Sequence, residues 1–361
     1  MSKPLLSVIV PCAPGRKERV AAILSRLTLN KAVFPDHTFE VLIADGGSTD
    51  DTIDLCRTLA QYINLKYVYL PIGRFINAAY PRNVLLRMCE GQIIAMIDID
   101  HFPGENIVFG MLNPFIDDSN FKVIINKDIG TVENRLEYLN GQVTKNKPSN
   151  IINRGYVVDS SKSALCACMF DPKAEIINKS IISMANIGNK ILHTYSHFKI
   201  PHGINNTLWT WAVKRENVLN MGAYDEIYVR GFRYRCEDDS IRERFLAQGL
   251  RFYDGQNKNF CSIHLYHPAE CRSNPLNEDN KRYFDKIECP VKQIDRNINF
   301  KWGKLLKDSF SIINGETRNT MEHEKWILEN VKDAPSYVDD FEWSSIDNFM
   351  KNLEDYYVSG H

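Results

Sequence analysis

Two carboxylates stand one residue apart at the end of an apolar stretch, as Asp98 and Asp100 in the run Ile97-Asp98-Ile99-Asp100-His101. Residues 92–97 before them are typical of a buried strand, so both acids would emerge at its carboxyl end, where open α/β sheets bind ligands. Carboxylate oxygens at such a place suit a divalent cation. A solvated loop or a helix cap would use the same residues, so the interpretation depends on the other motifs of the chain.

A second run of charged residues is Gly231-Phe232-Arg233-Tyr234-Arg235-Cys236-Glu237-Asp238-Asp239, which precedes a helix expected to end at Gly249. Three acids at a helix start interact favourably with its dipole, and that structural use alone would account for one or two of them. The arginines and aromatic residues directly upstream argue against a simple cap. A carboxylate at this place is suited to take a proton from a hydroxyl during a displacement reaction.

Three further positions carry chemically useful side chains. Asp45 stands ahead of two glycines, where a carboxylate can accept hydrogen bonds from a base or a ribose, and a plain turn aspartate is the alternative. Arg82, in Tyr80-Pro81-Arg82-Asn83, would face a phosphate or orient nearby acids, unless it is an exposed helical arginine. His264 and His267 follow an apolar strand and would join carboxylates around a metal such as Mn²⁺, with a structural histidine pair as the alternative.

The elements that position these residues alternate along the first hundred residues, which predicts an α/β fold with a mostly parallel, doubly wound sheet and right-handed crossovers. We expect strands at 6–10, 41–44, 66–70 and 92–97, and helices at 16–29, 50–62 and 75–89. No Gly-x-Gly-x-x-Gly or P-loop sequence is present, which argues against dinucleotide and ATP cradles.

The remaining chain divides into three parts. Residues 113–206 are expected to form an insertion of helices and loops, and 207–276 to return to order with a strand at 207–213 that buries one face. Residues 277–361 are predicted to be a helical extension with amphipathic stretches near 302–313, 321–331 and 344–356. Such helices pack on the main domain, join a partner chain or rest on a membrane surface, and packing is the commonest use.

Composition sets limits on the function. The 361 residues are 44% hydrophobic, and 44 basic against 45 acidic residues give a net charge of −1, so no global field attracts nucleic acid. Nine cysteines without Cys-x-x-Cys spacing favour a reducing cytoplasm. No apolar run is long enough for a signal peptide or a membrane span, so we expect a cytoplasmic protein, at most peripheral to the inner face of a membrane.

Taken in order, these motifs resemble the metal-dependent family 2 glycosyltransferases of the nucleotide-diphospho-sugar (GT-A) fold. Ser7-Val8-Ile9-Val10-Pro11 is similar to the opening strand of that family, residues 41–52 to its nucleoside-binding turn, and Asp98-Ile99-Asp100 to its D-x-D element. Met221-Gly222-Ala223-Tyr224-Asp225-Glu226, the acids 237–239, Arg244 and the two histidines resemble the acceptor half of animal β-galactosyltransferases and bacterial chondroitin-type polymerases. The resemblance covers about residues 5–270.

The resemblance implies roles by matching position. Asp238 would be the general base, and Glu237 would bind the acceptor or orient that base. Asp100 with one or both of His264 and His267 would bind Mn²⁺ or Mg²⁺. The nucleotide sugar would be bound by residues of 1–112: Pro11, Ala13, Asp45, Arg82, Asp98 and Ile99. The acceptor would stack on aromatic residues of the catalytic half, 207–276, although core packing is an equal alternative for the two tryptophans: Trp209, Trp211, Phe232 and Tyr234.

The implied reaction transfers a hexose or N-acetylhexosamine from a UDP-sugar to a hydroxyl of a glycan or lipid-linked glycan acceptor, with inversion at the anomeric carbon, as in polysaccharide biosynthesis. Two departures from the family pattern concern uracil recognition: Cys12-Ala13-Pro14-Gly15 replaces a polar turn, and Gly46 replaces a second acid. A sugar-nucleotide nucleotidyltransferase is one alternative, but Pro14-Gly15-Arg16-Lys17 is only a faint version of its triphosphate loop. A non-catalytic glycan-binding module is another, and it would be expected to have lost the acids or the histidines.

Overall fold

The computed structural model describes residues 3–31, 34, 38–72, 78–104, 106–116, 121–125, 134–138, 151–154, 156–159, 210–226, 237–254, 261–264 and 302–331. The expected helix at 344–356 lies outside these ranges. Four predicted site residues also lie outside them: Trp209, Phe232, Tyr234 and His267.

The amino-terminal third alternates strands and helices as predicted. Its elements are β1 (Leu6–Cys12), α1 (Lys17–Lys31), β2 (Phe39–Asp45), α2 (Thr52–Leu59), β3 (Leu65–Tyr69), α3 (Ala79–Met88) and β4 (Ile93–Ile97). The next described elements are β5 (His101–Pro103), α4 (Ile107–Leu112), β6 (Phe121–Ile125), β7 (Asn134–Tyr138), β8 (Ile151–Arg154) and β9 (Tyr156–Asp159). The last are β10 (Thr210–Lys214), α6 (Arg215–Asn220), α7 (Glu237–Ala247), β11 (Arg251–Asp254), β12 (Cys261–His264), β13 (Phe310–Ile313), β14 (Glu316–Asn319) and α10 (Thr320–Asn330).

The main sheet has nine strands in the order β11-β8-β10-β4-β1-β2-β3-β13-β14. Its centre, β4-β1-β2-β3, is parallel, while β10 and β13 pair antiparallel with the two sides of that centre. Strand β1 has β2 on one side and β4 on the other, so the strand order reverses there. In doubly wound sheets the crevice at this reversal, outside the carboxyl ends of the strands, is where ligands bind.

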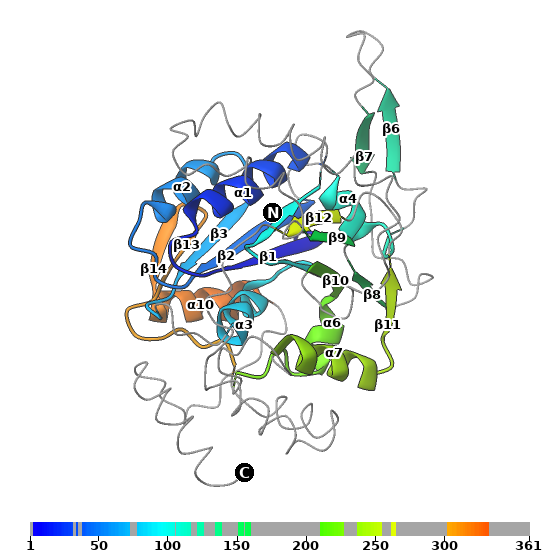
Figure 1. Cartoon of the computed structure of the whole chain (residues 1–361). Helices are drawn as coiled ribbons and strands as arrows, with labels where there is room; N and C mark the ends of the chain where they lie inside the picture. The colour runs from blue at the N-terminus through cyan, green and yellow to red at the C-terminus, as the bar shows by residue number, and fades with distance from the viewer. Residues whose placement is uncertain are drawn as a thin grey trace.

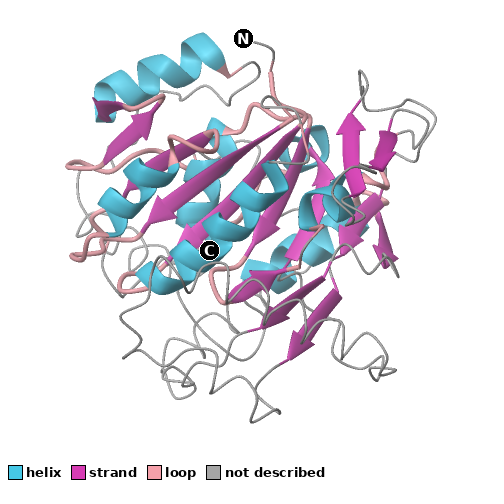
Figure 2. Cartoon of the chain, turned by 90° about the horizontal axis from the view of Figure 1, so that it is seen from above, coloured by secondary structure: helices cyan, strands magenta, loops and turns pink. Residues whose placement is uncertain are grey.

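Helices cover both faces of the sheet, as Figures 1 and 2 show: α1, α2 and α4 lie on one face, and α3, α6, α7 and α10 on the other. Alternate residues of β1 therefore enter two different cores. Val8 and Val10 pack with α1, whereas Ile9 packs with α3. Burial on both faces explains why these strands are continuous apolar runs rather than alternating ones. The predicted α/β fold, with its mostly parallel, doubly wound centre, is confirmed.

Three expectations about later segments were wrong. Where a helical stretch was expected near 302–313, β13 and β14 form a hairpin that extends the sheet beside β3. Within 121–159 the described residues form strands rather than helices, and β8 joins the main sheet beside β10. Strand β10 buries both of its faces instead of one, because α6 and α7 pack on one side of it and α4 on the other.

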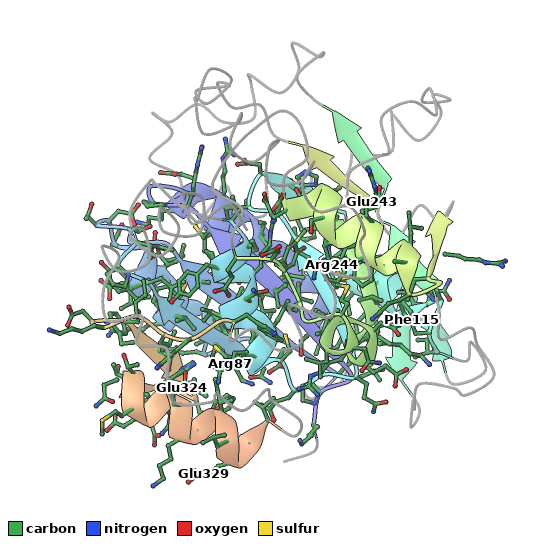
Figure 3. All side chains as sticks on the ribbon, turned by 90° about the horizontal axis from the view of Figure 1, so that it is seen from below. Arg87, Phe115, Glu243, Arg244, Glu324 and Glu329 are labelled. Atoms are coloured by element: carbon green, nitrogen blue, oxygen red, sulfur yellow. The ribbon has the colours of Figure 1, made fainter. Side chains whose placement is uncertain are left out.

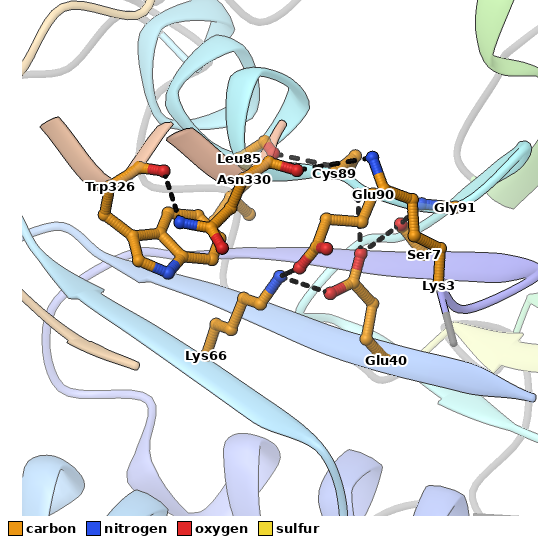
Figure 4. Close-up of polar contacts among 10 residues, drawn as sticks. All are labelled: Lys3, Ser7, Glu40, Lys66, Leu85, Cys89, Glu90, Gly91, Trp326 and Asn330. Carbon is orange, nitrogen blue, oxygen red and sulfur yellow. Dashed lines mark hydrogen bonds and ion pairs between the residues drawn. The ribbon is translucent and has the colours of Figure 1, made fainter. Parts of the chain in front are cut away.

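The amino-terminal edge of the sheet holds a buried polar network, drawn in Figure 4. The Lys66 ammonium lies 2.5 Å from carboxylate oxygens of both Glu40 and Glu90, and Ser7 Oγ donates to Glu40. The same ammonium lies 4.7 Å from the centre of the Trp326 ring on α10. Helix α10 is thereby held against the main sheet, and packing is the use expected to be commonest for amphipathic helices of this part of the chain.

No helix among the described residues is long and apolar enough to cross a membrane.

Candidate active site

The guanidinium group of Arg82 joins three carboxylates that are far apart in the sequence. Its Nη2 donates to Asp98 Oδ1 at 3.1 Å, and its Nη1 donates to Glu237 Oε1 and to Asp238 Oδ1, both at 2.9 Å. Asp98 belongs to the predicted donor half and the other two acids to the predicted acceptor half. The structure therefore brings together four residues that were predicted from the sequence to belong to one site.

The surrounding elements explain this convergence. Arg82 lies in the first turn of α3, whose amino end faces the carboxyl edge of the sheet. Asp98 follows β4 at the same edge. Glu237 and Asp238 begin α7, where the positive end of the helix dipole favours acids, as expected from the sequence.

Burial makes the Arg82 contacts strong. Its side chain is only 4% exposed, while that of Asp98 is 26% exposed and so remains open to a ligand. Burial by itself lowers the pKa of Arg82, but the charges of Asp238 and Asp98 raise it by more, and the net effect is well above the usual value. The Arg82 guanidinium also lies 5.1 Å from the centre of the Tyr224 ring, a cation–π contact. A permanent positive charge is thus fixed between the two halves of the site.

Asp45 is buried at the end of β2 and shapes the turn that follows it. Its Oδ1 accepts hydrogen bonds from the backbone N–H groups of Gly47 at 3.2 Å and Ser48 at 2.9 Å, and its Oδ2 accepts one from the Tyr67 hydroxyl at 2.7 Å. Burial, followed by the charge of Asp45, raises the pKa of Tyr67. Within the protein, Asp45 therefore acts as a turn aspartate, the alternative left open by the sequence.

The second acid of the D-x-D element, Asp100, pairs with Arg19 of α1. The strand register places His264 opposite His101, the residue after Asp100, so β12 reaches the D-x-D element as predicted. These donor types fit Mn²⁺ or Mg²⁺. Among the described residues, however, no three His, Cys, Asp or Glu side chains are grouped as a metal site.

The remaining predicted site residues differ in how far they are buried. Pro11 and Ala13, at the end of β1, are half-buried, whereas Ile99 is buried between the two acids. Trp211 is 0% exposed and packs edge-on against Phe245, with 5.9 Å between ring centres. Core packing, the alternative held for this tryptophan, is the role that its surroundings support.

Comparison with known proteins bears on the same region. Residues 7–168 match the family model described as Glycosyl transferase family 2, a range that holds Asp45, Arg82 and the D-x-D element. Over 333 residues the chain is 26% identical to the "Uncharacterized glycosyltransferase YfnE" of Bacillus subtilis, covering 89% of this chain and 79% of that protein. The chain is a glycosyltransferase. The match supports family 2, and it ends before the predicted acceptor half begins.

Two further comparisons concern TarS of Staphylococcus aureus. Over 121 residues, this chain is 31% identical to TarS, a poly(ribitol-phosphate) β-N-acetylglucosaminyltransferase; the match covers 34% of this chain and 20% of TarS. The crystal structure of TarS 1-349 in complex with UDP-GlcNAc is similar with a TM-score of 0.46 and 15% identity, over 82% of this chain and 70% of that one. The sequence match therefore spans one fifth of the full length of TarS.

Sequence reasoning missed several residues of the site. Arg19 contacts Asp100, the Tyr224 ring lies against Arg82, and Tyr67 binds Asp45. A weak signal existed for Tyr224, which lies in a run that was predicted from the sequence to belong to the acceptor half. Arg19 offered no such signal. It lies on helix α1, which carries no recognised motif, and only the folded structure shows that this helix places Arg19 beside Asp100.

Proposed function

We propose that the enzyme is a metal-dependent, inverting glycosyltransferase that moves a hexose or N-acetylhexosamine from a UDP-sugar to a hydroxyl of a glycan or glycoconjugate. The observation that carries this proposal is the single guanidinium of Arg82, which holds Asp98 on one side and Glu237 and Asp238 on the other. A site that transfers a group from one bound molecule to another needs its donor and acceptor halves held at a fixed separation.

The donor would lie at the carboxyl edge of β1, β2 and β4. Asp45 contributes there by fixing the turn at 46–48, whose backbone would face the uracil or the ribose, and Asp98 would bind the ribose or metal region. Pro11, Ala13 and Ile99 would contact the nucleotide. The local similarity to a β-N-acetylglucosaminyltransferase supports an N-acetylhexosamine donor, and the β configuration in its name agrees with inversion of an α-linked UDP-sugar.

A divalent cation, Mn²⁺ or Mg²⁺, would be held by Asp100 with His264, His267 or both, and when bound it would neutralise charge on the departing diphosphate. Carboxylate and imidazole are donor types that suit such a cation, and Asp100 lies next to His101, the residue opposite His264 in the strand register. This proximity supports the proposed cation site.

Asp238 would take the proton of the attacking hydroxyl. The 2.9 Å contact with Arg82 fixes the place of this carboxylate, and a positioned carboxylate is a suitable acceptor for the proton. Glu237, held by the same guanidinium nitrogen, would orient Asp238 or bind the acceptor. Attack from the side opposite the leaving diphosphate gives a single displacement with inversion. Trp209, Phe232 and Tyr234 remain predicted acceptor contacts.

A donor screen tests the proposal. We expect UDP release from a UDP-hexose or UDP-N-acetylhexosamine in a panel of nucleotide sugars, and proton NMR of the product should show an anomeric configuration opposite to that of the donor. Pyrophosphate release would instead indicate a nucleotidyltransferase. Retention of configuration would contradict the single displacement.

Replacing Asp100 with alanine should weaken the binding of UDP in the presence of Mn²⁺ by about tenfold or more, since ligands and their neighbours in metal sites typically account for changes of this size. Isothermal titration calorimetry with and without Mn²⁺ measures the effect. Asp54→Ala is a matched control, because Asp54 is an exposed carboxylate paired with an arginine outside the site. Equal UDP affinities in the two variants would rule out Asp100 as a metal ligand.

A further inference from the structure

Helix α3 is attached to the carboxyl-terminal part of the chain along its length. The Tyr80 hydroxyl donates to the Lys304 carbonyl oxygen at 2.7 Å, and Arg87 Nη1 donates to the Gly303 carbonyl oxygen at 3.1 Å. The two Nη groups of Arg87 also bind both carboxylate oxygens of Glu324 on α10, at 2.9 and 2.8 Å; Figure 3 labels the two residues. The helix that carries Arg82 is therefore held by residues more than 200 positions later in the sequence.

Glu226 is the point where this attachment reaches the site. Its Oε1 accepts hydrogen bonds from Asn83 Nδ2 at 2.8 Å and from the Gly303 backbone N–H at 2.6 Å. The Asn83 amide also binds both backbone groups of Tyr224: its Nδ2 donates to the carbonyl oxygen, and its Oδ1 accepts from the N–H, each at 2.9 Å. Asn83 directly follows Arg82, and the Tyr224 ring lies against the Arg82 guanidinium.

The contact at Gly303 tolerates no side chain. A Cβ atom there would lie 2.5 Å from the carbonyl oxygen of Asn83, and the residue has a φ of +67°, which favours glycine. The backbone at Gly303 thus packs directly on the backbone of α3 one residue beyond Arg82. Movement at this contact would be passed to the arginine without a flexible side chain between them.

Burying the Glu226 carboxyl group costs free energy, so its two hydrogen bonds indicate why a polar side chain occupies this position. The residue is 4% exposed, and burial raises its pKa to about 8, against the lowering effect of the bonds from Asn83 and Gly303. Asp225 adds to this increase, while Arg87 opposes it. A leucine would fill the same space at a lower cost in free energy, but it would leave the two donors without the acceptor oxygen that they share.

We infer that Glu226 is a positioning residue for sugar transfer: through Asn83, Tyr224 and Gly303 it holds Arg82 at the place where it can bind Asp98, Glu237 and Asp238 together. The inference rests on the proposed function. It assigns to Gly303 and Glu226 a part in the reaction through the contacts that hold Arg82 in place.

Steady-state kinetics of Glu226→Ala and Glu226→Gln test the inference. Alanine removes the shared acceptor, and we expect kcat to fall by about 10- to 100-fold, the scale of a displacement of about 1 Å in a catalytic group. The dissociation constant for UDP should change less than kcat does, because Asp98 stays at the end of β4 and the turn at 46–48 is held by its own bonds to Asp45 when Arg82 shifts. Glutamine keeps one oxygen acceptor and should restore kcat to within about threefold of the unaltered enzyme.

Ser311→Ala serves as the matched control for lost stability. Ser311 is buried in the same carboxyl-terminal part, and its 2.9 Å contact is with His323 Nδ1 of α10. This variant should lower the melting temperature while leaving kcat unchanged. If Glu226→Ala fails to fold, Glu226→Asp keeps the carboxylate but withdraws it by one methylene, and the same loss of kcat is expected.

An activity like that of Ser311→Ala in Glu226→Ala, or in Glu226→Asp if the alanine variant does not fold, would overturn the inference and leave the proposed function intact. If the unaltered enzyme transfers no sugar from any donor, the proposed function fails instead. A double-mutant cycle in urea unfolding, combining Glu226→Ala with Arg82→Lys, then decides the inference: non-additive losses of stability support it, and additive losses overturn it.

Discussion

Replacing Asp238 with asparagine should lower turnover by about 100-fold or more while leaving the binding of UDP almost unchanged. The amide keeps the shape of the carboxylate and can still accept the hydrogen bond from Arg82 Nη1, which is 2.9 Å long in the structure. It cannot take a proton from the attacking hydroxyl. Single-turnover kinetics with a saturating donor would separate the chemical step from binding.

Glu243→Gln is the matched control for this substitution. Glu243 lies on the same helix as Asp238, but it pairs with Arg242 on a half-exposed surface. Turnover of this variant should stay within about twofold of the unaltered enzyme, since exposed pairs contribute little. Near-normal turnover in Asp238→Asn would exclude this carboxylate as the base.

The second large effect is expected from Arg82→Ala, which would leave three carboxylates facing one another without their shared positive charge. Breaking a buried ion pair by removing one partner typically lowers the free energy of unfolding by about 3–5 kcal/mol. Transfer activity should fall at least as steeply as in Asp238→Asn, because both halves of the site lose their common partner. Urea unfolding and steady-state kinetics measure the two effects.

Two variants make this result interpretable. Arg82→Lys keeps the charge but not the planar fork that binds Asp98 and Glu237 from different nitrogens, so activity should remain low in a more stable protein. Arg57→Ala removes an arginine from an exposed pair with Asp54 and should change stability by less than about 0.5 kcal/mol. An Arg82→Ala protein as stable and active as Arg57→Ala would refute the central place given to Arg82.

The fold was largely predictable where local pattern and tertiary structure agree. The four central strands are short apolar runs between helical segments, and buried parallel strands leave that signature in any sequence. The hairpin of β13 and β14 was missed because its partner β3 lies about 240 residues earlier, beyond any local period. A signal was present all the same: Asn314-Gly315, both with positive φ, is a typical hairpin turn.

The site was predictable in its residue types but not in its contacts. The ends of predicted strands and the expected dipole of a helix at 237–249 made Asp98, Glu237 and Asp238 candidates from the sequence alone. Their common partner was not evident, since Arg82 is separated from the acids of α7 by about 155 residues. The burial of Trp211 was not evident from the sequence either. The same strand sequence fits a strand covered on both faces and a strand that presents its tryptophan to a sugar, and only the helices packed on β10 distinguish the two.

The hairpin also changes what the sheet presents to other molecules. Without it, β3 would end the parallel centre with a row of unpaired amide and carbonyl groups, a template for strand addition by a second chain. Strand β14 takes that place instead, with a mostly exposed face on which Glu316 and Arg318 form an ion pair. Charged side chains on a short border strand discourage intermolecular β-pairing, so this side of the molecule is protected against aggregation at high concentration.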